Sequence, residues 1–214
     1  MKIFNFSKLK LPIIQAPMAG GFNTPELASI VANSGGVGSF GFSFTNPRKI
    51  NELLNSTKKL TNGFINANFF IFKPVQLPEK QIQKAAIKAI ESLTLNENYE
   101  INIPKEPYYF DLDTQIEATL KNPPSIITFH LGIPSINIIK KIQLLGIKVG
   151  ITATNINEAK SIESVGADFI VAQGIEAGGH RGIFDQENID EKFKLDNLLI
   201  NILKNISLPV VAAG

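Results

Sequence analysis

The stretch "GIKVGITATNINEAKSIESVGADFIVAQG", residues 146–174, decides the fold. Two short apolar runs, Gly146–Ile151 and Asp168–Gly174, flank a polar segment that starts at the capping residue Asn155 and ends at Gly166. Nearly continuous apolar runs are typical of strands covered on both faces, and a capped segment ending in glycine is typical of a helix. The stretch therefore predicts a strand–helix–strand unit.

The same alternation extends along the rest of the chain. Further apolar runs of strand length are Leu11–Pro17, Gly35–Phe40, Gly63–Phe70, Ser125–Gly132 and Leu208–Gly214. Helix-like segments between the strands are Thr24–Gly35, Asn46–Leu60, Pro134–Gly146 and roughly Ile189–Asn205. This order of about seven strands predicts a parallel α/β sheet, either doubly wound or closed into a barrel.

One segment, Lys73–Pro124, breaks the alternation. It holds a polar helix-like stretch, Glu79–Leu93, and a loop rich in proline and tyrosine. An insertion of this length is more often a lid or a loop over a site than a separate domain. We therefore expect residues 1–214 to form one domain, with a helix and loop insertion at about 73–124.

Composition excludes several classes of protein. No apolar run approaches the roughly 20 residues that span a bilayer, and the N-terminus lacks the apolar core of a signal peptide. A net charge of +2 without a basic cluster indicates no nucleic-acid partner, so a cytoplasmic protein without a membrane partner is expected. The absence of cysteine excludes disulfides, and two histidines alone make a poor zinc ligand set, which predicts no metal site.

Ligands of βα folds bind at the carboxyl ends of the strands, so those residues are candidates for a site. After the first strand, Gln15–Gly21 combines small residues with Met18, which suits packing against a flat ligand, although a tight turn with a core methionine gives the same pattern. Asn66 and Asn68 face one side of the third strand. Their amides suit the edge of a heterocycle, or else bonds to neighbouring backbone.

The stretch "QGIEAGGHRG", Gln173–Gly182, is the most specific candidate. Gln173 ends a strand, and Gly178 and Gly179 leave room and free N–H groups for an extended ligand. His180 can exchange protons near neutral pH. A flexible glycine turn with a solvated histidine is the alternative. The other histidine, His130, ends "SIITFH" and is either a core residue or part of the same site.

Three motifs in order, "PIIQAPMAGG", "DFIVAQGIEAGGHRG" and "LPVVAAG", resemble those of the nitronate monooxygenases, formerly called 2-nitropropane dioxygenases. "SIITFHLGIPS" and "FDLDTQ" resemble the bacterial class I branch, so the likeness covers nearly the whole chain. The resemblance implies a TIM-type (β/α)8 barrel, here with about seven strands and without the eighth. It also implies FMN-dependent oxidation of alkyl nitronates, such as propionate 3-nitronate, by O2.

The resemblance also implies roles for single residues. Ala16, Pro17 and Met18 would pack beside the flavin ring. Asn68, with Asn66 as the alternative register, and Gln173 would hydrogen-bond its polar edge. Gly178 and Gly179 would pass close to the cofactor, and Gly214 would begin a glycine loop at the phosphate. His180 would be the catalytic base or would orient the substrate, and His130 would be a second catalytic histidine facing the nitronate.

Members of that family continue past Gly214, so the resemblance leaves the phosphate site incomplete and predicts weak or absent FMN binding by the 214 residues alone. A homodimer or a complementing C-terminal fragment would supply the missing part. Two other interpretations stay open. One is a flavin-dependent enoyl-acyl carrier protein reductase, which would accept electrons from NADH or NADPH, and the other is an inactive remnant of the enzyme.

Overall fold

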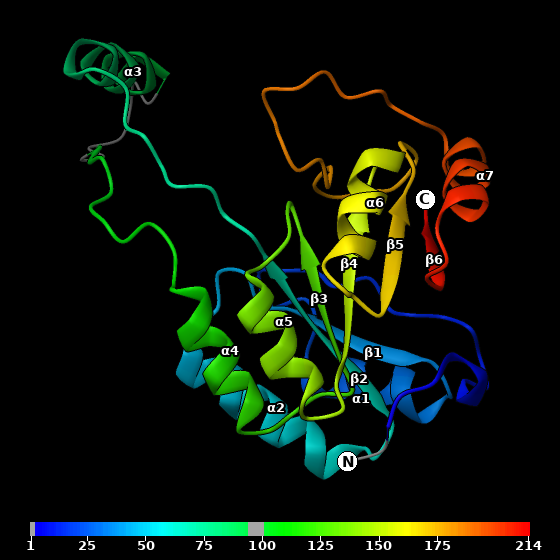
Figure 1. The fold of residues 1–214 in the computed structure, drawn as a ribbon. Helices are drawn as coiled ribbons and strands as arrows, with labels where there is room; N and C mark the ends of the chain where they lie inside the picture. Colours follow the sequence, from blue (N-terminus) through cyan, green and yellow to red (C-terminus); the bar gives the residue numbers. More distant parts are fainter. Residues whose placement is uncertain (1–2, 94–100) are drawn as a thin grey trace. The chain divides into compact units, whose positions relative to one another are not determined.

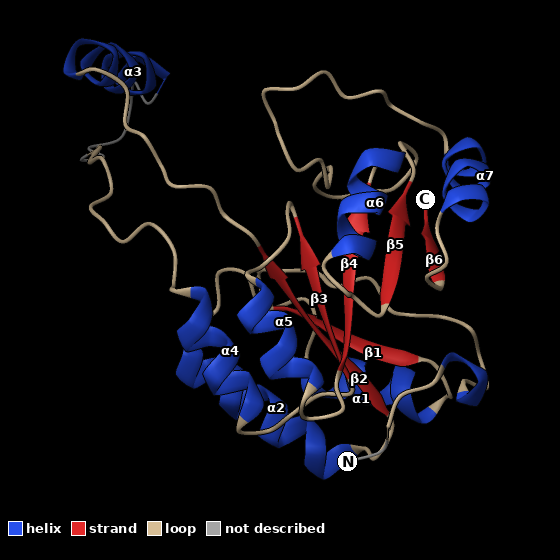
Figure 2. Ribbon diagram, in the orientation of Figure 1, coloured by secondary structure: helices blue, strands red, loops and turns tan. Residues whose placement is uncertain are grey.

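A single sheet of six parallel strands, each paired with its neighbours in sequence, organises the protein (Figure 1). The structure is a computed structural model that describes residues 3–93 and 101–214. The strands are β1 (Val37–Gly41), β2 (Phe64–Phe70), β3 (Ile126–His130), β4 (Lys148–Ala153), β5 (Phe169–Gln173) and β6 (Val210–Ala213). The predicted α/β fold is confirmed as an incomplete TIM-type barrel, a curled sheet whose strands alternate with helices (Figure 2).

Helices connect the strands along the chain. They are α1 (Pro25–Asn33), α2 (Pro47–Leu60), α3 (Lys80–Leu93), α4 (Leu112–Leu120), α5 (Ile136–Gln143), α6 (Ile156–Ser164) and α7 (Leu195–Asn205), after a 3-10 turn, η1 (Phe6–Lys8). Their starts follow the predicted caps: Thr24 accepts from the N–H of Leu27, and Asn155 from two N–H groups of α6. Of the helices described, none has the length and apolar character needed to cross a bilayer.

The chain divides into two compact units. The larger unit comprises Met1–Phe72 and Phe110–Gly214 and contains the whole sheet, and the smaller is Lys73–Tyr109. Within the smaller unit, α3 buries none of its residues, and the hydroxyl of Tyr109 donates to the carbonyl of Lys73 over 3.1 Å. Helix α4 belongs to the larger unit and packs on α2.

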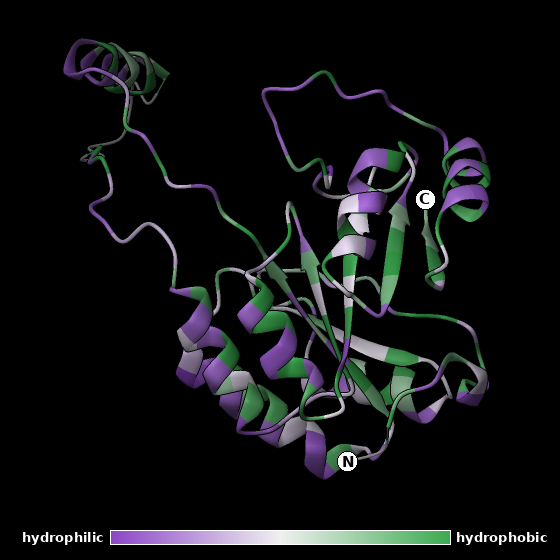
Figure 3. Cartoon of the chain, in the orientation of Figure 1, coloured by the Kyte–Doolittle hydropathy of each residue, from purple (hydrophilic) through white to green (hydrophobic). Residues whose placement is uncertain are grey.

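The two faces of the sheet have different partners because successive side chains of a strand point to opposite sides. On β2, Ile65, Ala67 and Phe69 join the apolar core formed with the helices. Figure 3 shows the strands mainly in hydrophobic colours and mixed colours on the helices. The alternate residues of β2 include Asn66 and Asn68, which are buried on the inner face of the curled sheet.

Aromatic side chains fill the inner face at the amino ends of the strands. Phe4 packs edge-on against Phe6 and Phe64, with ring centroids 4.9 and 5.1 Å apart, and Phe6 packs likewise on Phe169 at 5.4 Å. Such edge-to-face pairs add to the hydrophobic stabilisation of the buried rings. The N-terminal segment therefore closes this end of the sheet, and the carboxyl ends remain for a ligand.

Three elements differ from the sequence-based expectation. The first predicted strand, Leu11–Pro17, forms only an isolated bridge at Ile14, because the prolines at its two ends have no N–H to donate to a ladder. Helix α7 begins six residues later than predicted, since Lys192 has a left-handed φ of 50°. Helix α4 was not predicted, and Asp111 caps it by accepting from the N–H of Thr114.

Close approach of α1 to β1 gives a test of this packing. A methyl group at Gly38 would lie 2.0 Å from the carbonyl oxygen of Ala28, so Gly38→Ala must displace the helix from the sheet. We expect it to lower the free energy of unfolding by about 2–3 kcal/mol in urea denaturation. Gly178→Ala is the matched control, because nothing lies within 4 Å of the added methyl group. Equal stability of the two variants would contradict this account.

Candidate active site

The turn after Ile14 lies over the carboxyl end of β1. A methyl group at Gly41 would come 2.8 Å from the main chain of Met18, which shows how closely the turn passes. Asn23 fixes this turn: its Oδ1 accepts from the N–H of Met18 over 2.7 Å, and its Nδ2 donates to the carbonyl of Ala16 over 3.4 Å. The Met18 side chain is left 44% exposed. Sequence reasoning singled out the turn but not Asn23.

Buried polar side chains form a connected layer on the inner face above the aromatic rings. The Nδ2 of Asn66 donates to the Ser39 hydroxyl over 3.3 Å, and its Oδ1 accepts from the Thr128 hydroxyl over 3.1 Å. Asn68 Nδ2 donates to the hydroxyl and the carbonyl of Thr128 over 2.9 and 3.3 Å. Among residues 3–93 and 101–214, Oδ1 of Asn68 has no hydrogen-bond donor, so this oxygen is free to accept one from a ligand.

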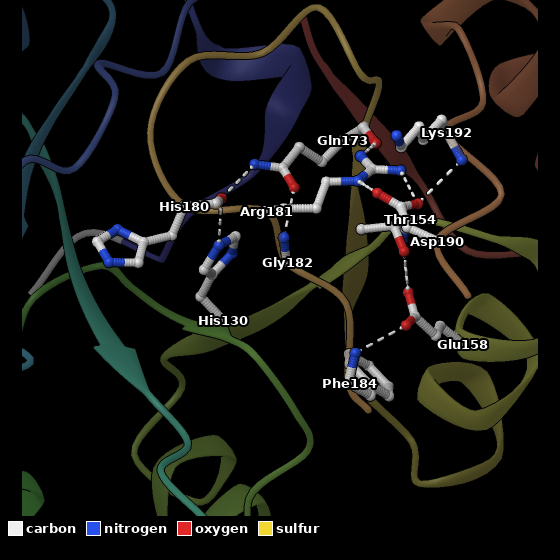
Figure 4. A network of polar contacts seen from close by, with 10 residues as sticks. All are labelled: His130, Thr154, Glu158, Gln173, His180, Arg181, Gly182, Phe184, Asp190 and Lys192. Atoms are coloured by element: carbon white, nitrogen blue, oxygen red, sulfur yellow. Dashed lines mark hydrogen bonds and ion pairs between the residues drawn. The ribbon is translucent and has the colours of Figure 1, made fainter. Parts of the chain in front are cut away.

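Gln173, the last residue of β5, binds the loop that follows it. Its Oε1 accepts from the N–H of Gly182 over 2.7 Å, and its Nε2 donates to the carbonyl of His180 over 2.9 Å. Figure 4 shows these two bonds holding the loop against the strand end. One side-chain amide thus accepts from a backbone N–H of the loop and donates to a backbone carbonyl of the loop, as the main chain of a neighbouring strand would.

Arg181 and Asp190 form an ion pair within the same loop. The guanidinium Nε and Nη2 donate to the two carboxylate oxygens over 2.9 and 3.1 Å, and Nη1 donates to the Gln173 carbonyl over 2.6 Å. The guanidinium hydrogen bond lowers the pKa of Asp190, against a smaller opposing effect of burial. Because Lys192 N–H also donates to Asp190, over 2.9 Å, the carboxylate shapes the segment that was predicted to be helical.

Glu158 of α6 ties the same loop to β4. One carboxylate oxygen accepts from the N–H and the hydroxyl of Thr154 over 2.6 and 2.8 Å, and the other accepts from the N–H of Phe184 over 2.8 Å. The side chain is buried, so its charge is compensated by these donors. Glu176 joins the same loop to α7: its Oε2 accepts from the N–H of Leu195, the first residue of that helix.

Both histidines pack against Phe70. Its ring centroid is 5.4 Å from that of His130 and 5.2 Å from that of His180. Nε2 of His130 lies 3.0 Å from the carbonyl of His180, whereas the exposed His180 ring makes no hydrogen bond within the part of the chain that is described. Figure 4 shows the His180 imidazole pointing away from the contacts that its own carbonyl makes.

Burial has the largest effect on the charge state of His130 and lowers its pKa below the ordinary 6.5. Its hydrogen bond to the His180 carbonyl acts in the opposite direction, and the nearby charges of His180 and Arg181 lower the pKa further. The neutral ring is therefore favoured near pH 7. Since a carbonyl oxygen only accepts, Nε2 carries the proton in this bond.

The two glycines before His180 border open space. A methyl group added at Gly178 or Gly179 would meet no atom within 4 Å. Gly179 has a positive φ of 81°, which suits glycine. Gly214, just after β6, lies near the same loop, because a methyl group there would be 3.6 Å from the N–H of Ala177. The carboxyl ends of β5 and β6 thus meet beside this space.

The sequence-predicted residues fall into two groups at this edge. Gln173, His130 and His180 are linked through the His180 carbonyl, whereas Asn68 bonds Thr128, which lies two residues before His130 on β3. Ala16, Pro17 and Met18 lie over β1. Residues that sequence reasoning missed are Asn23, Thr128, Glu158, Arg181 and Asp190. Two of them had a signal: Thr128 lies two residues before His130 and therefore shares its face, and Arg181 follows His180 in the glycine-rich stretch.

Comparison with known families identifies the relatives of this chain. The family model described as nitronate monooxygenase matches residues 3–214. The chain belongs to the nitronate monooxygenase family. The resemblance noted in the sequence is thereby confirmed, and the family itself is flavin-dependent.

Two curated nitronate monooxygenases illustrate the relationship. The protein of Paraburkholderia phytofirmans is 38% identical over 216 residues, covering 95% of this chain and 56% of its own length. That of Pseudomonas aeruginosa is 35% identical over 209 residues, covering 96% of this chain and 59% of its own. The chain therefore spans somewhat more than half the length of these nitronate monooxygenases.

Solved structures show the same fold. Nitroalkane oxidase from Streptomyces ansochromogenes superposes with a TM-score of 0.84 at 29% identity, over 97% of this chain and 59% of that one. FabK from Thermotoga maritima superposes with a TM-score of 0.67 at 20% identity, over 95% of this chain and 50% of that one. The second likeness establishes the fold alone.

The lowered pKa of His130 predicts how stability depends on pH. The unfolded chain takes up the proton near pH 6.5, but the folded chain does so only at lower pH. As pH falls through this window, the unfolded state binds more protons and the free energy of unfolding decreases, at up to about 1.4 kcal/mol per pH unit. Urea denaturation between about pH 5 and 7.5 measures this slope, above the range in which Asp190 titrates.

His130→Gln is the matched variant for that measurement, since its side chain does not titrate. We expect the slope between about pH 5 and 6.5 to be smaller in this variant than in the unmodified chain. An identical slope in the two proteins would show that His130 does not titrate below its ordinary range.

Proposed function

We propose that this chain carries the flavin- and substrate-binding face of an enzyme that oxidises alkyl nitronates, of the propionate 3-nitronate type, with FMN and O2. The observation that carries the proposal is the unengaged imidazole of His180, beside the open space at Gly178 and Gly179. Membership of the nitronate monooxygenase family supports it. Two nitronate monooxygenases, of Paraburkholderia phytofirmans and Pseudomonas aeruginosa, support the reaction class.

The residues present fit a flavin at this edge. Open space over Gly178 and Gly179 admits a flat ring system, and the carboxamide oxygen of Asn68 is free to accept a hydrogen bond from it. Gln173 Nε2 has two hydrogens and uses one on the His180 carbonyl, so the other can reach the ring. When bound, FMN supplies the redox chemistry between nitronate and O2.

Other residues hold the rest of the cofactor in this proposal. The exposed Met18, with Ala16 and Pro17, packs on one side of the ring. Gly214 begins the phosphate-side loop, where the absence of a side chain lets the backbone approach. The assignment of these residues rests on their place at the carboxyl ends of the first and last strands.

His180 acts on the substrate itself. A nitronate is an anion, and an imidazole can orient it by a hydrogen bond or exchange a proton with it near neutral pH. Phe70, Phe44 and Phe72 form an aromatic cluster on the same side, with Phe44 and Phe72 centroids 5.1 Å apart. We infer that this cluster contacts the alkyl part of the nitronate and keeps water from it.

His180→Asn tests the catalytic assignment. The change removes proton exchange but keeps a small polar side chain, so kcat/KM for propionate 3-nitronate should fall about 10²–10⁴-fold. The affinity for FMN, titrated by flavin fluorescence, should stay within a factor of about two because His180 does not hold the ring. Oxygen consumption in the presence of excess FMN gives the rate.

Two results would contradict the proposal. One is unchanged nitronate turnover in His180→Asn. The other is rapid anaerobic bleaching of the bound flavin by NADH or NADPH, which would instead indicate a reductase of the enoyl-acyl carrier protein type.

A further inference from the structure

The main chain around His180 is held at adjacent points, although the His180 ring makes no hydrogen bond to the described residues and only packs against Phe70. The His180 carbonyl accepts two hydrogen bonds, from Nε2 of Gln173 over 2.9 Å and from Nε2 of His130 over 3.0 Å. Two residues later, the N–H of Gly182 donates to Gln173 over 2.7 Å. This pattern fixes the direction in which the His180 side chain leaves the backbone.

The ring of His130 is enclosed by the loop that it holds. Its Nε2 meets the His180 carbonyl, and its Cε1 and Nδ1 would lie 2.7 and 3.1 Å from a methyl group at Gly182. On another side the ring packs near Phe70, with centroids 5.4 Å apart. Both ring nitrogens therefore lie beside the loop at His180 and Gly182.

Resting on the proposed catalytic role of His180, we propose that His130 is a positioning residue. It holds the His180 imidazole in place through the His180 carbonyl and exchanges no proton with the substrate. The family resemblance implied a catalytic role for both histidines, whereas the geometry points to different tasks for them. A catalytic group must be held to within a fraction of an ångström, which requires a rigid support behind it.

A second set of contacts that holds the loop involves Arg181, the residue after His180. Arg181 joins the carbonyl of Gln173 to the carboxylate of Asp190, nine residues further along the loop. Those two side chains are only 19% and 22% exposed, so the pair is partly shielded from water. The loop is thus fixed both by His130 and by this ion pair, and among the described residues only His130 and Gln173 hydrogen-bond to the His180 carbonyl itself.

Matched variants of His130 separate positioning from proton exchange. His130→Gln keeps an N–H donor at about the position of Nε2, whereas His130→Asn is too short to reach the carbonyl. Hydrogen exchange of the full chain should become at least about tenfold faster at amides 177–182 in the Asn variant, and should stay within about twofold of the unmodified chain in the Gln variant. The amides of β3 and β4 are the internal control for the fold.

The His180 ring supplies a second measurement. The chain has two histidines, so in either variant His180 gives the single imidazole signal in a proton–carbon correlation spectrum. We expect its position in the Gln variant to match that of the unmodified chain, and to move toward that of an unstructured histidine in the Asn variant. His130→Leu, apolar and of similar volume, replaces the Asn variant if urea denaturation shows that the latter is unfolded.

Two outcomes would overturn the proposal. One is exchange at 177–182 that is the same in all variants. The other is loss of nitronate turnover in His130→Gln as severe as in His130→Asn, although its loop stays protected, which would assign proton exchange to His130. If the unmodified chain with FMN turns over no nitronate, the proposed function fails on its own, and the exchange measurements still decide the role of His130.

Discussion

Alternation of side chains along parallel strands is the constraint on which the site depends. On β2, the residues that face the helices are all apolar, so the residues between them must line the inner face, where water is excluded. Polar groups there must hydrogen-bond to one another, because a buried amide without a partner lowers the free energy of unfolding by about one to several kcal/mol. The Asn66–Thr128–Asn68 chain meets this requirement and locks β2 to β3 directly below the site.

The loop after β5 carries His180 and is itself held in place by side chains. It runs about twenty residues to α7 with little regular structure, a length that is usually functional in compact domains. Its order comes from side chains instead of a backbone ladder: Gln173 from the strand, Glu158 from α6 and the Arg181–Asp190 pair within the loop. Each contact bonds a backbone group that would otherwise be unpaired, so the loop can present His180 without burying it.

Local signals predicted most of the elements, although not α4 or the start of α7, and they directed attention to the carboxyl ends of the strands. Capping residues such as Thr24 and Asn155 marked helix starts, and glycines around His180 marked the loop. Long-range pairing could not be predicted from the sequence. His130 bonds a backbone carbonyl that is fifty residues away in the sequence. Asp190 lies in a segment with a helical pattern but pairs with Arg181 instead. Neither contact can be predicted from composition or periodicity.

We propose that the carboxyl ends of the strands, and not another face, bind the flavin. Titration of isotope-labelled chain with FMN, followed by amide chemical shifts, tests it most directly. The account predicts that shifts concentrate at Gly178, Gly179, His180 and the side-chain amide of Asn68, while Phe64 and the other residues at the amino ends stay unchanged. Shifts confined to the amino ends, where a cavity of about 400 Å³ is lined by Lys8 and Lys10, would contradict it.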